Sequence, residues 1–338
     1  MASGWALVLA ALAASLAAGV LIGPVALPPR EVLLGLASKL PLLRVHTGLS
    51  AADLAIVWQI RAPRVVLGLL VGSMLSMAGG AYQGVFRNPL ADPYLLGAAA
   101  GAGLGATLVI TSGFVGSLGP IGPIQAAAFA GAMLAVGATW ALARGRNRIR
   151  STATLILAGV AVTSLLTAVQ TYYQQRSDST LRSVYSWILG SLATASWHSV
   201  ALMLPWAVIG TVGVLLHLRV IDVLAVGDEE AATLGLAVER TRLTVVLSAT
   251  LATAAAVSVS GLIGFVGIIV PHTVRLLVGS SNRAVIPLSI VGGGAFLVAA
   301  DLFARTAIAP AEIPIGVITA LIGGPFFLAL LARRVSRT

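Results

Sequence analysis

Charged residues are scarce in this chain of 338 residues: only 9% are Asp, Glu, Lys or Arg, whereas 58% are hydrophobic. A soluble domain carries about 25% charged residues, because water must wet its surface. The shortage of charge therefore excludes an ordinary water-soluble enzyme and a disordered protein. It predicts a polytopic membrane protein whose main solvent is lipid.

Cysteine is absent, and Lys39 is the only lysine. The chain therefore has no disulfide or thiol nucleophile, and it lacks the G-x-x-x-x-G-K-[ST] loop that cradles nucleotide phosphates. The motifs G-x-S-x-G and H-E-x-x-H are also missing, and the four histidines do not have the spacing of metal ligands. We therefore expect no catalytic residue, no metal site and no cofactor bound by this chain. In any ATP-driven process, a partner would bind ATP and Mg²⁺.

Positive charge exceeds negative charge, with 21 basic and 11 acidic residues and a formal net charge of +10. No basic run alternates with aromatic residues on a polar face, so the excess does not indicate a nucleic-acid partner. Basic loops beside membrane spans account for it instead.

Windows of about 20 residues without charge predict spanning helices, and we expect an all-α bundle of ten in a single domain, residues 1–338. The first span is expected to be retained rather than cleaved, because no basic leader precedes it. The two long windows should break at the Gly- and Pro-rich residues 113–123 and 261–271. The predicted spans cover residues 5–23, 65–85, two helices within 92–144, 152–171, 198–218, two helices within 243–278, 284–304 and 313–332.

Ten crossings would place both termini on one side of the membrane. The positive-inside rule makes that side cytoplasmic, because about 13 of the 21 basic residues fall in loops on that side. Among them are the clusters Arg144, Arg146, Arg148 and Arg150, and Arg333, Arg334 and Arg337. Residues 65–171 and 241–332 each form a block of four spans with a glycine-rich interruption. Because the two blocks start on opposite sides, they indicate inverted repeats.

A polar corner follows the second span and consists of Arg87, Asn88, Pro89, Asp92 and Pro93. Asp92 is expected to cap the next helix, with Pro93 at its first position. The longer string through this corner, from Gly-Ala-Tyr-Gln-Gly-Val-Phe to Leu-Leu-Gly at residues 80–97, resembles the FecCD family. This family comprises the permease subunits of bacterial ABC importers for ferric siderophores, haem and cobalamin. Further matching strings, in the family's order, lie at residues 58–64, 157–160, 264–272 and 313–317.

The resemblance implies a ten-helix subunit that pairs with a second permease, identical or related, around a central path. It also implies two cytoplasmic ATPase subunits, an extracytoplasmic binding protein and a location in the bacterial inner or plasma membrane. The cargo would be a metal chelate, with ferric siderophore or haem favoured over cobalamin, moved by alternating access. A secondary transporter driven by an ion gradient is the alternative, although no carboxylate is clearly placed in mid-span.

The loop after the sixth span, residues 219–240, contains an acidic turn followed by apolar residues. Acidic residues in a first turn favour a short amphipathic surface helix, although a solvated loop is an equal alternative from the residues alone. The resemblance implies a coupling helix that seats in a groove of the ATPase. The residues concerned are Asp228, Glu229, Glu230, Ala231, Thr233, Leu234, Gly235 and Leu236.

Arg61, Arg64 and Arg305 are expected on the outer side, where the positive-inside rule predicts few basic residues. Arg61 and Arg64 share a helical face at the outer end of the second span, and Arg305 lies at the outer end of the ninth. Their side chains could reach lipid headgroups by snorkelling. The resemblance implies instead that they receive carboxylates from the two lobes of the binding protein, which suits the planar guanidinium.

Overall fold

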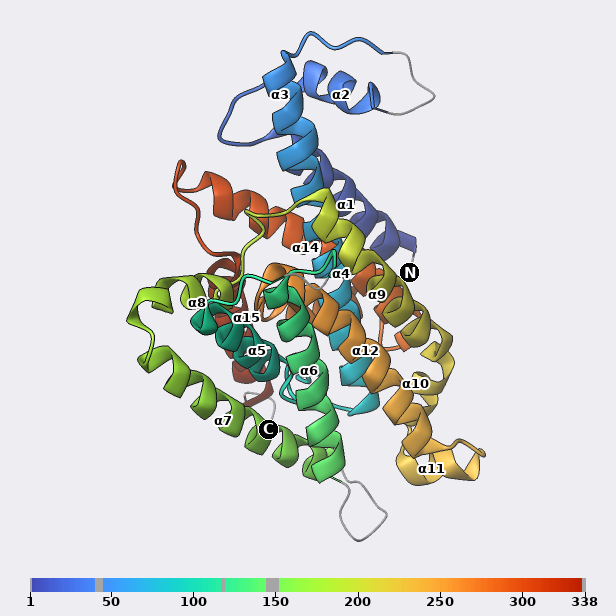
Figure 1. The fold of residues 1–338 in the computed structure, drawn as a ribbon. Coiled ribbons are helices and arrows are strands. Elements are labelled where there is room, and N and C mark those ends of the chain that lie inside the picture. Colours follow the sequence, from blue (N-terminus) through green and yellow to red (C-terminus); the bar gives the residue numbers. More distant parts are fainter. Residues whose placement is uncertain (1, 40–44, 117–118, 144–151, 336–338) are drawn as a thin grey trace.

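The computed structural model describes residues 2–39, 45–116, 119–143 and 152–335 (Figure 1). Helices make up the regular secondary structure of these ranges, so the predicted all-α class is confirmed. The basic residues Arg144, Arg146, Arg148, Arg150 and Arg337 lie outside the described residues.

Seven helices in the described part are long and apolar enough to cross a membrane. They are α1 (Ala2–Leu21), α4 (Ala62–Val85), α6 (Pro123–Leu142), α7 (Thr152–Gln175), α9 (Trp197–Leu216), α12 (Val238–Ser260) and α14 (Asn282–Thr306). The second of them is longer than expected, because α3 (Ala51–Ala55) and the π-helical η1 (Ile56–Arg61) continue directly into α4.

Three shorter apolar helices complete the ten predicted crossings: α5 (Ala98–Ser112), α13 (Val266–Val278) and α15 (Ile315–Val335). The break between α5 and α6 lies at the Gly- and Pro-rich residues 113–122, as predicted. The break between α12 and α13 is shorter than expected. It covers only residues 261–265, and Pro271 lies inside α13.

Several short helices were not foreseen, because charge-free windows reveal only full crossings. They are α2 (Pro29–Ala37), η2 (Asp178–Thr180), α8 (Leu181–Ile188) and α10 (Leu218–Leu224). The acidic turn does form a helix, α11 (Asp228–Thr233), directly after α10.

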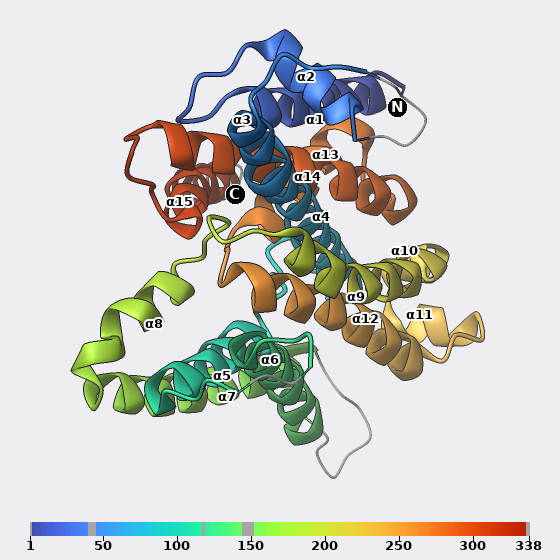
Figure 2. The same cartoon turned by 45° about the horizontal axis from the view of Figure 1, so that its top comes forward.

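Helix α4 lies at the centre of the bundle and packs against α9, α12, α13 and α14. In its most apolar stretch 83% of residues are buried, compared with 17% in α7, which leaves α7 facing lipid or a partner. In Figure 2, α5, α6 and α7 form one group, α1, α13 and α14 lie on the opposite side, and α4 runs between them.

Glycines hold the central helices close together. Gly72 of α4 lies against Gly293 of α14, and a Cβ added to either residue would clash with the other's carbonyl oxygen. A Cβ added to Gly79 of α4 would likewise clash with the carbonyl group of Gly267 of α13. Such contacts matter in a membrane, because lipid offers no hydrophobic drive for helix association and backbones gain from close packing instead.

Candidate functional site

The polar corner after α4 is a folded-in loop rather than a helix cap. Helix α5 begins only at Ala98, after Gly97 with φ of 90°, so the expected capping by Asp92 and the expected position of Pro93 are wrong. Asp92 instead accepts a hydrogen bond from the backbone N–H of Tyr94 at 2.8 Å. Burial raises the pKa of the Asp92 carboxyl to about 6.

The residues after Asp92 turn inward because the Tyr94 side chain binds the backbone between α12 and α13. Its hydroxyl donates to the carbonyl of Ile263 at 3.0 Å and accepts from the N–H of the same residue at 3.2 Å. Ile263 lies between α12 and α13, where backbone groups have no helical partner. The Tyr94 hydroxyl thus satisfies polar backbone that lipid could not.

At the other end of the corner, Arg87 contacts the acidic helix. Asp228, the first residue of α11, receives two hydrogen bonds of 2.9 Å from Arg242 of α12 and lies 3.4 Å from the guanidinium of Arg87. Arg87 has φ of 50°, in the left-handed region that few residues other than glycine adopt. A carboxylate shared by two arginines therefore ties α11 to α4 and α12.

The rest of α11 presents an amphipathic face to the outside. Ala231 is buried, and Leu236 packs against the core, so the helix is seated on the bundle. Gly235 has φ of 82°, which suits glycine just after a helix end. Leu234 is 73% exposed, and Glu229, Glu230 and Thr233 are exposed with it. Leu234 and the acidic residues thus form an exposed surface outside the apolar spans.

The three outer arginines are buried, and none is more than 6% accessible. Their side chains bind groups of the chain itself. Arg64 makes a bidentate contact with Asp301 and a second with Glu312, at 2.8–3.0 Å. Arg305 lies 3.6 Å from Asp301, four residues earlier on α14.

Two of these arginines also stabilise the end of α1. Arg61 donates to the carbonyls of Val20 and Leu21 at 3.1 and 3.0 Å, and Arg305 donates to that of Gly19. The last carbonyls of a helix have no partner within it and carry partial negative charge, so cations are stabilising there. The spacing of Asp301 and Arg305 could have predicted one ion pair, but the carbonyl partners on α1 have no signal in the sequence.

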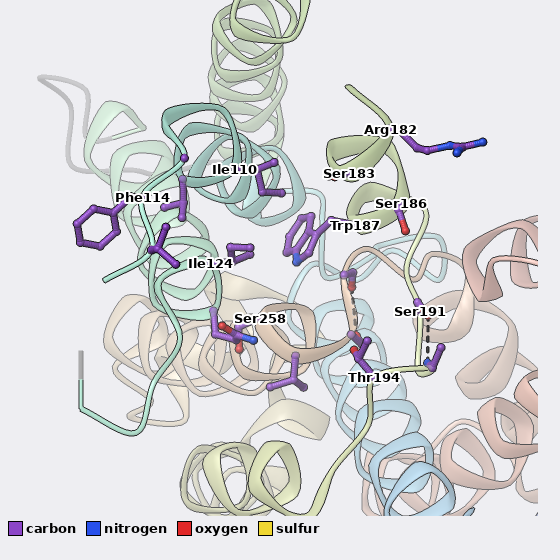
Figure 3. Close-up of a pocket in the computed structure, with 18 residues that line it drawn as sticks. Ile110, Phe114, Ile124, Arg182, Ser183, Ser186, Trp187, Ser191, Thr194 and Ser258 are labelled. Atoms are coloured by element: carbon purple, nitrogen blue, oxygen red, sulfur yellow. Dashed lines mark hydrogen bonds between the residues drawn. The ribbon is translucent and has the colours of Figure 1, made fainter. Parts of the chain in front are cut away.

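A cavity of about 840 Å³ opens between the α5–α6 pair, α8 and the end of α12 (Figure 3). Trp187, Ile124 and Phe114 supply apolar surface, and Ser186, Ser191 and Ser258 supply hydroxyls. Arg182 also lines the cavity, but its guanidinium points away from the other labelled side chains. The site has the size and mixed character of a small-molecule pocket.

In the described part of the chain, ten apolar helices carry a short acidic helix at one end and an arginine–carboxylate cluster at the other, which fits a multi-pass membrane protein. Comparison with known families is specific: residues 8–333 match the FecCD transport family, and the chain belongs to it.

Curated relatives agree with this membership. The cobalamin import system permease protein BtuC of Halobacterium salinarum is 47% identical over 282 residues, covering 83% of this chain and 74% of the relative. The hemin transport system permease protein HmuU of Yersinia pestis is 40% identical, covering 82% and 84%. The iron(3+)-hydroxamate import system permease protein FhuG of Bacillus subtilis is 36% identical, covering 84% and 85%.

A solved structure has the same fold. It is described as the inward-facing conformation of an ABC transporter of metal-chelate type, and it superposes with a TM-score of 0.84 at 28% identity. The superposition covers 98% of this chain and all of the other.

Proposed function

We propose that the chain is the permease subunit of an ATP-driven ABC importer that takes up a metal chelate by alternating access. The observation that carries the proposal is a FecCD match through nearly the whole of a chain that has no phosphate-binding loop. The relatives named for cobalamin, hemin and iron(3+)-hydroxamate support a chelated metal as the cargo. An ion-coupled carrier gains no support, because Asp301 and Glu312 are both paired with Arg64.

The importer would contain a second permease, identical or related, two ATPase subunits that bind ATP and Mg²⁺, and an extracytoplasmic binding protein. In this proposal the end of the bundle that carries α11 faces the cytoplasm, together with both termini. The exposed apolar residues of α7, among them Leu157 and Leu165, supply surface for lipid or for the second permease.

Transport assays test the energy source and the cargo together. The chain, reconstituted in proteoliposomes with its ATPase and binding protein, should accumulate one of three probes when ATP is supplied: cyanocobalamin, haemin or ferrichrome. The chain alone should neither hydrolyse ATP nor accumulate any probe. Accumulation by the chain alone under an imposed proton or sodium gradient would establish the ion-coupled alternative instead.

The proposed coupling surface consists of Asp228, Glu229, Glu230, Ala231, Thr233, Leu234, Gly235 and Leu236. Its support is the exposed face of α11 and the tie from Asp228 to Arg87 and Arg242. A push on α11 from the ATPase would reach α4 and α12 through this shared carboxylate. The corner residues Asn88, Pro89, Asp92 and Pro93 would carry that movement toward Tyr94 and the break before α13.

Leu234→Asp should leave the permease folded but reduce retention of the ATPase at least about tenfold, because an unpaired charge would be buried in the contact. The measurement is ATPase co-purification at matched permease levels. Val226→Asp is the matched control, because Val226 is 68% exposed, nearly as much as Leu234, but lies before the start of α11. Unchanged retention with Leu234→Asp, or equal losses from both variants, would contradict the assignment.

Docking of a binding protein at the arginine cluster stays a proposal. The partners that the arginines have within the chain limit how a carboxylate of that protein could reach them. Arg61 and Arg305 are engaged by carbonyls of α1, and Arg64 by two carboxylates. Glu312 is the more exposed of these two, with 34% of its side chain accessible, and its pKa is lowered by the hydrogen bond from Arg64. A carboxylate of a docking lobe would therefore have to exchange with Glu312.

A further inference from the structure

A polar cavity of about 230 Å³ lies at the end of the bundle that carries α11. It is bounded by the C-terminal end of α4, the corner, the residue after α10, and the turn from α13 to α14. Its polar lining consists of Gln83, Arg87, Arg275, Ser280 and Asn282. These groups come from segments far apart in the sequence, so only the tertiary structure brings them together.

The lining carries more positive charge than its surroundings neutralise. In the described part of the chain, Arg275 has one side-chain partner, the neutral amide oxygen of Gln83. Arg87 has Asp228 at 3.4 Å, but that carboxylate already accepts two hydrogen bonds of 2.9 Å from Arg242. The cavity is thus lined by two guanidinium groups, of which Arg87 shares the single carboxylate of Asp228 with Arg242, and this excess of positive charge favours an anion in the cavity.

Asn282 provides a second, independent observation. The residue is only 4% exposed, its Oδ1 is buried without a hydrogen-bond partner, and its amide lines the cavity. Its backbone N–H is held at 2.6 Å by Asp222, which fixes the residue at the start of α14. The Oδ1 is an acceptor and gains nothing from an anion, so the group that Asn282 offers to a ligand in the cavity is the Nδ2 amino group, a hydrogen-bond donor.

We infer that this cavity binds a phosphate-type anion, either the phosphoryl group of a lipid headgroup or free inorganic phosphate. Tetrahedral phosphate oxygens can accept from both guanidinium groups and from the amide of Asn282 at once, and planar guanidinium favours such bidentate contacts. The cavity has room for a phosphoryl group with part of a headgroup. It lies where α4 ends and α14 begins.

Two arms of one experiment distinguish the sources of the anion. The full chain is purified free of lipid in a maltoside detergent, which carries no phosphoryl group. In the first arm inorganic phosphate is titrated and the thermal midpoint is followed. In the second arm, in phosphate-free buffer, phosphatidylglycerol is added, and native mass spectrometry counts the lipids that stay bound. Binding in the first arm identifies free phosphate, and binding in the second arm alone identifies a lipid headgroup.

Arg275→Gln should weaken the observed binding about tenfold, because it removes a charge-assisted contact. Arg283→Gln is the matched control, because Arg283 directly follows Asn282 in α14 but does not line the cavity. Its side chain is 60% exposed and lies 3.8 Å from Asp222. This control should leave binding unchanged. Asn282→Leu removes the amide without altering charge and should weaken binding several-fold. If Arg275→Gln does not fold, this second variant tests whether the anion binds in the cavity. No binding in either arm, or equal losses from Arg275→Gln and Arg283→Gln, overturns the site, because diffuse surface attraction depends only on charge.

Discussion

Asp301→Asn should destabilise the permease strongly, by about 3–5 kcal/mol, the cost of removing one partner from a buried ion pair. Asp301 is 3% exposed and contacts two arginines that are equally buried. Asparagine can still accept a hydrogen bond from Arg64, but it leaves the positive charges of Arg64 and Arg305 facing each other without an anion between them. Arg305 also donates to the carbonyl of Gly19 near the end of α1, so the first span should loosen as well.

The measurement is the thermal midpoint of the detergent-solubilised chain, followed by size-exclusion chromatography. Glu312→Gln is the matched control, because it makes the same chemical change at the carboxylate that is 34% exposed and contacts only Arg64. Its cost should fall below about 1 kcal/mol, as for partly solvated ion pairs. If Arg64 receives a carboxylate of the binding protein, Glu312→Gln should also raise that protein's affinity. Equal midpoints for Asp301→Asn and the wild type would show that the cluster does not stabilise the fold.

Gly79→Ala should have the second large effect, at or beyond the upper end of the range of about 1–3 kcal/mol for overpacking. The new Cβ would lie well inside van der Waals contact with the carbonyl group of Gly267. That carbonyl cannot move freely, because it accepts a hydrogen bond of 2.9 Å from Gln83 and belongs to the first turn of α13. The substitution should therefore force α4 and α13 apart.

Gly137→Ala provides the comparison, since it makes the same substitution in the spanning helix α6 with nothing within 4 Å of the added Cβ. Alanine is the better helix former, so this variant should be neutral or slightly more stable. The yield of folded protein and its thermal midpoint are measured for both variants. If the two alanines prove equally tolerated, close packing at Gly79 is not what holds α4 against α13.

Local composition was enough to predict the membrane class and nearly all the spans. A span must be apolar over about 20 consecutive residues, so its signal is contiguous in the chain and needs no knowledge of neighbours. The Gly- and Pro-rich break before α6 and the acidic first turn of α11 are local in the same sense. The FecCD resemblance also rested on contiguous strings, and the family match confirmed it. The inverted repeats remain a prediction.

The tertiary structure decided which groups meet, because polar atoms inside a bundle must find partners wherever the fold offers them. The sequence placed Arg61, Arg64 and Arg305 at the outer end but could not show that the carbonyls of α1 and the carboxylates of Asp301 and Glu312 bury them. Asp92 had every local feature of a helix cap, yet the chain turns inward there because the Tyr94 hydroxyl satisfies the broken backbone at Ile263. The ion pair of Arg64 with Asp301 and the hydrogen bond of Tyr94 with Ile263 each join residues more than 150 positions apart, and their energy depends on burial that only packing creates.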